Sequence, residues 1–510
     1  MPALTRLGGF AVLYMTAILL ELVERWRHPY AATAALALVL ALLAFGVTRI
    51  TFLVFLASTT AYFLLAQFPD VANHVNIEIY CNLLLMAAIG WSLVRRRDYP
   101  EDDDVYEMVR PALQASMLLV YGLAGFAKLN ADFLNPEVSC VGTMVGDLAR
   151  VATLERAGIP TGLLLLLPLL YLAYRLLAPR LSRAPLVAGL AAVAATWLVA
   201  LLVWPGLDSP AASGFLVGMA VAVILWELVL GPMLAIPALQ LPVLVVSWGM
   251  HAALALIGFV DFGALALALL LTFVPRGYAD LVNAPMRLPL VGRPMPRVQV
   301  YFAICVVAGV CSALGRRFPA GLAFNLAALV LLWPIIEAAA ARGAAPWRGV
   351  PISSPLTPRW LFAFPLLLLL HGLTSYLGLR TAGNFTMFSN LRTEGARSNH
   401  LVLPGNPLKL WGYDEDAVRV LEIDDARAAI GHQYQPLRGH RLPVVEFRKL
   451  IRAWSRAGAT VPVRFEYAGT TWATDDIARD PVWGRAHRDW KMRLLDFRVI
   501  QDDGPNRCRW

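Results

Sequence analysis

Tyr121-Gly-Leu-Ala-Gly-Phe-Ala-Lys-Leu-Asn-Ala-Asp-Phe133 closes an apolar run that begins at position 111. The run from 111 to 127 is long enough to form a membrane-spanning helix, and Lys128 stands where it ends. On a helix Tyr121, Ala124 and Gly125 share the face of Lys128, because they precede it by seven, four and three residues. The two small residues leave room beside the amine for a ligand ring or another helix.

Lys128 is an unusual residue for this chain. Among the 44 Lys and Arg residues, the only lysines are at positions 128, 409, 449 and 491. Arginine stays protonated in proteins, whereas an amine that is removed from water can lose its proton. Lys128 is therefore a candidate base. The alternative is a lysine that reaches toward the membrane surface and caps the helix end.

The pattern Tyr121-x-x-Ala-Gly-x-x-Lys-Leu-x-x-Asp-Phe133 resembles a stretch of the vitamin K-dependent gamma-carboxylases. It also resembles that of their bacterial relatives, the HTTM (horizontally transferred transmembrane) family, and the resemblance extends over roughly residues 50–280. In the carboxylases the matching lysine is the base that removes a proton from reduced vitamin K. The resemblance therefore implies a catalytic Lys128. It also implies a reduced quinone of the vitamin K or menaquinol type, with oxygen and carbon dioxide as co-substrates.

The composition is that of a membrane protein that crosses the bilayer many times. The 510 residues are 58% hydrophobic and have a mean hydropathy of +0.60. The net charge of +9 comes from arginines scattered through short loops, without a basic face. This pattern does not favour binding to nucleic acid. The first apolar run, 8–23, contains Glu21 and no convincing cleavage site, so we expect a retained helix rather than a signal peptide.

The apolar runs predict about thirteen spans of roughly 15–23 residues each. They fall near 8–23, 31–47, 51–68, 76–94, 111–128, 161–178, 184–204, 213–230, 238–258, 262–275, 299–314, 319–341 and 360–378. Every second loop is richer in arginine, and this distribution favours a cytoplasmic N-terminus in an inner (plasma) membrane. An odd number of spans then places Lys128 at the outer end of its helix and the C-terminal region outside.

Residues 380–510 are more polar and predict a second, extracytoplasmic domain of α+β type, after a helical membrane domain at 1–379. Alternating apolar residues predict strands at 408–411, 418–423, 461–467 and 494–500. Residues 444–456 have the spacing of one amphipathic helix. The segment 381–391, which follows the last span, is rich in aromatic and amide side chains, and we interpret it as a lid or docking turn over the outer end of the bundle.

Ionisable groups within apolar spans are unfavourable by about 2.5–3.5 kcal/mol each on insertion scales, which makes them candidate site residues. Asn73-His74 begins a polar stripe with four-residue spacing that continues to Glu78 and Asn82. Further along the chain, Glu227, His251 and Asp261 lie in or beside spans. The alternative role for each of these residues is a hydrogen bond that joins two helices.

The resemblance assigns roles to several of these polar residues. Asn73-His74 matches a carboxylase pair, and Glu227 matches a glutamate-containing helix. The segment from His251 to Phe259 matches a further motif. We therefore expect Lys128, His74 and His251 to be catalytic, and Tyr121, Gly125, Asn73 and Glu227 to bind the quinone.

Two departures from the family pattern put the peptide substrate in doubt. Phe133 stands where tryptophan is usual, and an expected asparagine after His251 is missing. We expect no metal, since the common ligand motifs are absent from the sequence. Cys140 and Cys508 are the two cysteines outside the apolar runs, on the oxidising side, where they could form a disulfide.

The sequence thus predicts a membrane enzyme that resembles the gamma-carboxylases. Its partners would be the lipid bilayer, a quinone, and an unknown protein or small-molecule acceptor. The competing hypothesis is a non-enzymatic membrane protein that binds lipid or quinone, or that assists assembly through its outer domain.

Overall fold

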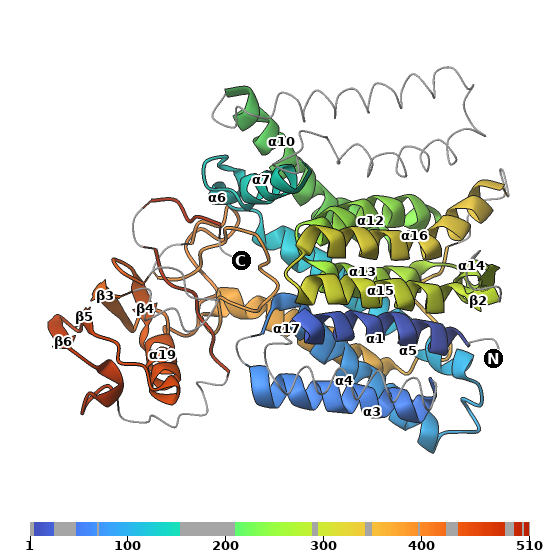
Figure 1. Cartoon of the computed structure of the whole chain (residues 1–510), viewed down its shortest axis with the longest axis horizontal. Helices are drawn as coiled ribbons and strands as arrows, with labels where there is room; N and C mark the ends of the chain where they lie inside the picture. Colours follow the sequence, from blue (N-terminus) through green and yellow to red (C-terminus); the bar gives the residue numbers. More distant parts are fainter. Residues whose placement is uncertain are drawn as a thin grey trace.

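The computed structural model describes residues 5–24, 47–68, 71–152, 210–287, 294–341, 349–395, 398–424, 437–484, 494–501 and 504–508. Figure 1 shows a bundle of helices with a smaller, partly β-stranded region at one end. We call this end, where residues 380–508 pack, the domain end, and the opposite end the far end. In the described part of the chain, seven helices are long and apolar enough to cross a membrane.

The longer helices match the apolar runs that fall on described residues, whereas the runs near 31–47, 161–178 and 184–204 lie outside them. They are α1 (Arg6–Glu24), α3 (Arg49–Tyr62), α4 (Asn73–Val94), α5 (Asp102–Ala127), α10 (Pro210–Leu225), α12 (Gln240–Leu256), α13 (Val260–Leu270), α15 (Arg297–Ala313), α16 (Arg317–Ala341) and α17 (Ala363–Leu377). Shorter segments include π turns η1 (Phe63–Gln67) and η2 (Trp226–Leu230), 3₁₀ turn η5 (Arg359–Phe362), and helices α6 (Ala131–Leu134), α7 (Cys140–Ala152) and α14 (Arg276–Asn283).

Helix α1 lies in the middle of the bundle. It packs against α13, α15 and α5, and 83% of its span is buried, compared with 33% for the spans that contain α3 and α17. Its apolar residues occur on every side, as expected for a helix that neighbouring helices surround. Helix α1 is therefore enclosed by its neighbouring helices.

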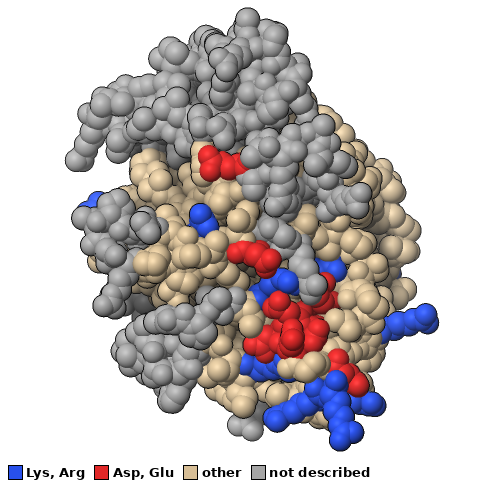
Figure 2. Space-filling view, turned by 90° about the vertical axis from the view of Figure 1, so that its right-hand side faces the viewer, with Lys and Arg blue, Asp and Glu red and all other residues tan. Residues whose placement is uncertain are grey.

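Charged residues gather at the far end of the bundle, on the face shown in Figure 2. The acidic stretch at 101–107 begins helix α5: its aspartates form the first turn, where negative side chains stabilise a helix N-terminus. Arg6 of α1 contacts Asp103 at 3.3 Å and Glu107 at 3.5 Å, and Arg49 of α3 contacts Asp102 at 2.6 Å. These pairs connect the ends of three helices.

The C-terminal region contains an antiparallel sheet in the order β4-β3-β5-β6, covered by helix α19 (Val444–Ala457). The strands are β3 (Ala417–Ile423), β4 (Arg441–Pro443), β5 (Val463–Tyr467) and β6 (Thr470–Thr474). Their inward side chains form a separate hydrophobic core with α19, centred on Phe447, Trp454 and Phe465.

Two of the four predicted strands, 418–423 and 461–467, correspond to β3 and β5, and the predicted helix corresponds to α19. The other two predictions are wrong. Residues 408–411 are irregular, and residues 494–500 make only isolated bridges, from Asp496 to Arg380 and from Ile500 to Arg441. These bridges lead to two separate segments, so no continuous ladder forms.

The segment between α17 and the sheet packs against the helix ends at the domain end of the bundle. Gly378 ends α17 in the left-handed conformation, with φ of 72°, which reverses the chain without strain. His400 joins this segment to α5, because its Nε2 donates to the carbonyl of Phe126 at 2.9 Å. Its Nδ1 accepts from the amides of Val402 (3.1 Å) and Leu403 (3.2 Å).

Acid should loosen the contact that His400 makes. Burial lowers the pKa of His400, although the bond to the Phe126 carbonyl acts in the opposite direction. A lowered pKa in the folded state means that this contribution to stability is complete above about pH 6.5, the ordinary histidine value, and is lost as the pH falls through the folded pKa. Protonation of Nδ1 removes the acceptor for the amides of Val402 and Leu403.

Hydrogen exchange of these two amides, corrected for intrinsic rates, should therefore accelerate between neutral and acid pH. The amide of Leu410 is the control, because its acceptor is the carbonyl of Leu377 rather than a titrating group. Equal protection of all three amides at both pH values would contradict this role of His400.

Candidate functional site

A cavity of about 160 Å³ lies toward the domain end, between helices α5, α10, α12 and α13. Its polar lining consists of Tyr121, Lys128, Glu227 and His251, and its other lining residues are apolar. An apolar cavity with a few converging polar groups is the usual form of a small-molecule site. An engineered cavity of about 150 Å³ admits one benzene-sized ring, so one aromatic ring fits here without rearrangement.

Lys128 is the C-cap residue of α5, and its side chain turns inward instead of reaching the surface. Only 4% of the residue is exposed. Its Nζ lies 2.9 Å from Oε1 and 2.8 Å from Oε2 of Glu227. It also contacts the carbonyls of Met387 at 3.1 Å and Ala124 at 3.4 Å. Every hydrogen of the ammonium group thus has an acceptor, in a buried ion pair.

Glu227 reaches Lys128 because the helix changes its pitch at this point. The π turn η2 (Trp226–Leu230) continues α10, and both Trp226 and Glu227 line the cavity. Such turns inside helices frequently occur at functional sites. Gly125 allows the close approach, since a Cβ there would lie 2.8 Å from the side chain of Leu228 and 2.9 Å from that of Glu227. Gly125 therefore accommodates a helix, and it is not among the residues that line the cavity.

Tyr121 and His251 form the second polar pair of the cavity. The tyrosine hydroxyl lies 3.1 Å from Nε2 of His251, and Trp226 packs edge-on against the Tyr121 ring at 4.8 Å. Nδ1 of His251 is buried and has no hydrogen-bond partner among the described residues. When Tyr121 donates to Nε2, the neutral imidazole carries its proton on Nδ1, which can then donate to a ligand oxygen.

Asn73 and His74 do not line this cavity, contrary to the sequence prediction. Oδ1 of Asn73 accepts a hydrogen bond from the amide of Phe385 at 2.6 Å. His74 faces α1 and α13, and the ring of Phe262 lies between it and His251, with centroid distances of 5.9 and 5.0 Å. The side chain of His74 is thus engaged by α1 and α13 rather than by the residues around Lys128.

His74 instead forms a buried cluster with two carboxylates. Its Nε2 lies 3.1 Å from Glu21 of α1 and 2.8 Å from Asp261 of α13. The ligand atoms all lie within 4.8 Å of one another, so one imidazole and two carboxylates could hold a divalent cation. They also join three helices as ion pairs. Sequence reasoning singled out His74 and Asp261 separately but did not bring the three residues together, because they are far apart along the chain.

The segment 381–391 packs over the domain end of the cavity. Met387 and Phe388 line it, and the ring of Phe388 packs edge-on against Phe259 at 5.2 Å. Three residues here have positive φ without being glycine: Phe385 (64°), Phe388 (48°) and Asn390 (54°). Strained backbone of this kind clusters at ligand clamps and switch regions. The position agrees with the interpretation of this segment as a lid or docking turn.

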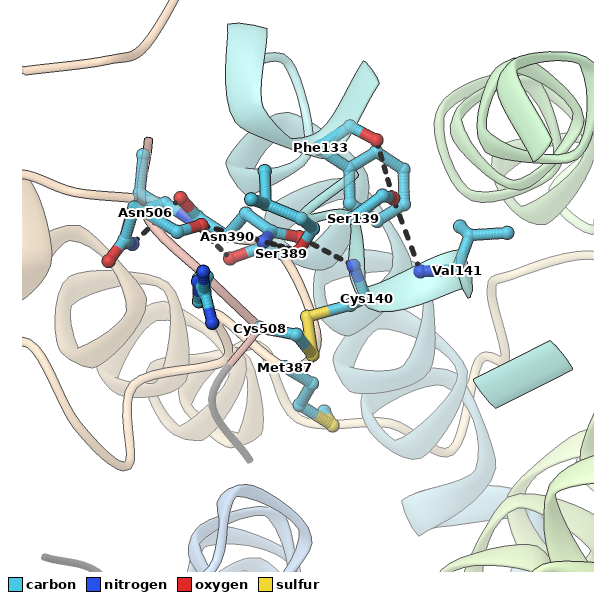
Figure 3. Close-up of a disulfide and its surroundings, with 12 residues drawn as sticks. Phe133, Ser139, Cys140, Val141, Met387, Ser389, Asn390, Asn506 and Cys508 are labelled. Carbon is cyan, nitrogen blue, oxygen red and sulfur yellow. Dashed lines mark hydrogen bonds between the residues drawn. A yellow bond between two sulfur atoms is a disulfide. The ribbon is translucent and has the colours of Figure 1, made fainter. Parts of the chain in front are cut away.

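Cys140 and Cys508 are joined as a disulfide, the pairing expected from the sequence (Figure 3). Asn390 lies beside it and holds the same elements together. Its Oδ1 accepts from the amide of Cys140 at 2.8 Å, and its Nδ2 donates to the carbonyl of Asn506 at 2.9 Å. The disulfide therefore connects α7, next to the cavity, with the segment at 504–508.

Loss of the disulfide should weaken the docking of this segment. Cys508→Ser should destabilise the protein by about 2–5 kcal/mol, the usual range for a native disulfide. A thermal denaturation series in detergent, with and without reductant, measures the effect. Cys311→Ser is the matched control, since Cys311 is a free cysteine. If reductant lowers the melting temperature of Cys508→Ser as much as that of the wild type, the disulfide is not the cause.

Removing one partner of the Lys128–Glu227 pair should destabilise the protein more than removing both. Glu227→Leu leaves a buried ammonium without its counter-charge, a loss of about 3–5 kcal/mol. Lys128→Met combined with Glu227→Leu removes both charges and should restore much of that loss. Thermal melting of the four combinations gives the coupling energy, and additive effects of the two substitutions would mean that the side chains do not interact.

We compared the chain with protein-family models, curated proteins and solved structures, and none of these comparisons found a match.

Proposed function

We propose that this protein is a membrane enzyme that resembles the vitamin K-dependent gamma-carboxylases and binds a reduced quinone in the cavity beside Lys128. One observation carries the proposal. The only lysine of the first 400 residues is buried at an apolar cavity, paired with Glu227 and close to the Tyr121–His251 pair. A lysine at the protein surface is solvated by water and does not require a buried carboxylate as its partner.

The lining suits the head of a quinone. Its apolar side chains match a flat ring, and Nδ1 of His251 offers a buried donor that an oxygen of the ring would satisfy. A reduced quinone would supply, together with oxygen, the driving force for removing an unreactive proton from an acceptor to which carbon dioxide then adds. Tyr121 would hold the imidazole of His251 in orientation through their hydrogen bond.

Lys128 can accept a proton only after it has lost one. The contact with Glu227 provides the path, because Nζ can pass a proton directly to the carboxylate 2.8 Å away. The transfer would leave a neutral amine beside a neutral acid, so that no unpaired charge remains in the buried site. The amine would then accept a hydroxyl proton from the bound quinol, while the lining excludes water.

The orientation is part of the same proposal. About thirteen spans in an inner (plasma) membrane, with a cytoplasmic N-terminus, would place residues 380–510 and Lys128 on the outer side. The disulfide between Cys140 and Cys508 supports this, because such bonds persist in oxidising compartments.

A specific observation favours the non-enzymatic alternative. The ammonium hydrogens of Lys128 are all satisfied by protein acceptors, as expected for an ion pair that holds helices together. In that case the cavity would bind a lipid or quinone without turnover. The two functions differ in what they require of residue 128.

Lys128→Arg separates the two functions, because arginine keeps the charge but cannot serve as a base. We expect the purified wild type to turn over reduced quinone and the variant to be folded but inactive. Lys449→Arg is the matched control, since Lys449 pairs with Glu446 on α19, away from the cavity. His251→Ala should weaken turnover less than Lys128→Arg. Full turnover by Lys128→Arg would refute the base mechanism.

Mass spectrometry for co-purified quinone tests binding separately.

A further inference from the structure

Residues 401–411 form a hydrophobic surface segment at the domain end. Five of the seven exposed large hydrophobic residues in the described part of 380–510 lie within it, and the other two are Val482 and Leu494. The five are Leu401 (56% exposed), Val402 (58%), Leu408 (46%), Leu410 (69%) and Trp411 (42%). An exposed hydrophobic patch of this kind usually marks a contact with a protein partner or a membrane.

The segment presents almost no charge. Its single charged residue is Lys409, and that side chain turns toward the protein. Nζ of Lys409 contacts Asp414 at 2.9 Å, Glu415 at 3.1 Å and the carbonyl of Gly395 at 3.0 Å. The outward side chains are thus those of leucine, valine, tryptophan and proline, which are apolar.

Backbone hydrogen bonds hold the segment level with the ends of two bundle helices. The amide of Leu401 donates to the carbonyl of Leu129 at 2.8 Å, just beyond α5. The amides of Leu410 and Trp411 both donate at 3.2 Å to the carbonyl of Leu377, the last residue of α17. The segment therefore cannot move far from the plane in which these helices end.

That plane is where the hydrocarbon layer should end. The span that contains α17 has 19 residues, which is about 28 Å of helix and close to the roughly 30 Å thickness of a bilayer core. Closer to its start, α17 exposes Leu366, Leu367 and Leu370, the side chains that face lipid in a membrane helix. Residues 401–411 lie beyond these leucines, at the end of α17, which is the level expected for the headgroups.

We propose that residues 401–411 are a membrane-contact segment, whose apolar side chains enter the headgroup region of the bilayer beside α17. Trp411 suits this level, because tryptophan is enriched where hydrocarbon meets water. The fixed level of the segment, at the end of a span of bilayer length, favours lipid over a protein partner as the occupant. The segment would fix the depth of residues 381–400, including Met387 at the cavity. The proposal does not depend on quinone chemistry.

Photo-crosslinking to lipid tests this proposal on the unmodified full chain. The protein is reconstituted in phosphatidylethanolamine–phosphatidylglycerol vesicles that contain a diazirine-bearing phospholipid, and labelled peptides are mapped by mass spectrometry. We expect label on residues 401–411 and on Leu366–Leu370, the positive control. Arg464, which is exposed on the sheet (52% of its side chain), should stay unlabelled. Label on α17 without label on 401–411 would overturn the proposal.

A substitution gives a second, independent measurement. Leu410→Glu places a charge in the contact, which membranes resist, and should reduce labelling of 401–411 several-fold while leaving labelling of α17 unchanged. Val482→Glu is the matched control, since Val482 is similarly exposed (52%) but belongs to the sheet region. Crosslinks from 401–411 to a second copy of the chain, in place of lipid, would identify the segment as a subunit interface and refute membrane contact.

Discussion

The ion pair between Lys128 and Glu227 is the contact on which the domain end of this protein depends. Neither charge is tolerable alone in an apolar bundle, so α5 and η2 must stay close enough for Nζ and the carboxylate to meet at 2.8 Å. Gly125 provides the necessary space. Because Nζ also binds the carbonyl of Met387, the same charge holds the segment over the cavity in position.

Two groups of polar residues in the bundle have different tasks. Lys128, Glu227, Tyr121 and His251 face one cavity, and within the described part of the chain their pairs leave one buried imidazole nitrogen without a partner. The cluster of His74 with Glu21 and Asp261 lies behind the ring of Phe262 and joins three helices. Phe262 thus lies between the cavity, which has room for a ligand, and the His74 cluster, whose side chains contact one another directly.

The sequence predicted what depends on local spacing and missed what depends on how helices are rotated. Helical periodicity placed Tyr121, Ala124 and Lys128 on one face, and all three line the cavity. The same reasoning gave the polar stripe that begins at His74, but not the direction in which α4 turns it. The π turn at Trp226 has no signature in the amino-acid pattern. The strand expected at 494–500 failed because pairing depends on which segments lie beside it.

Disulfide formation closes the chain into a loop that contains most of the molecule. Cys140 and Cys508 are separated by 368 positions, so α10 to α17, the segment 381–391 and the whole sheet region lie on a covalently closed ring. A single break in the backbone within that ring would not release either piece. Protease nicking in an exposed turn would therefore leave the sheet region attached to the bundle, and the two fragments would separate only after reduction.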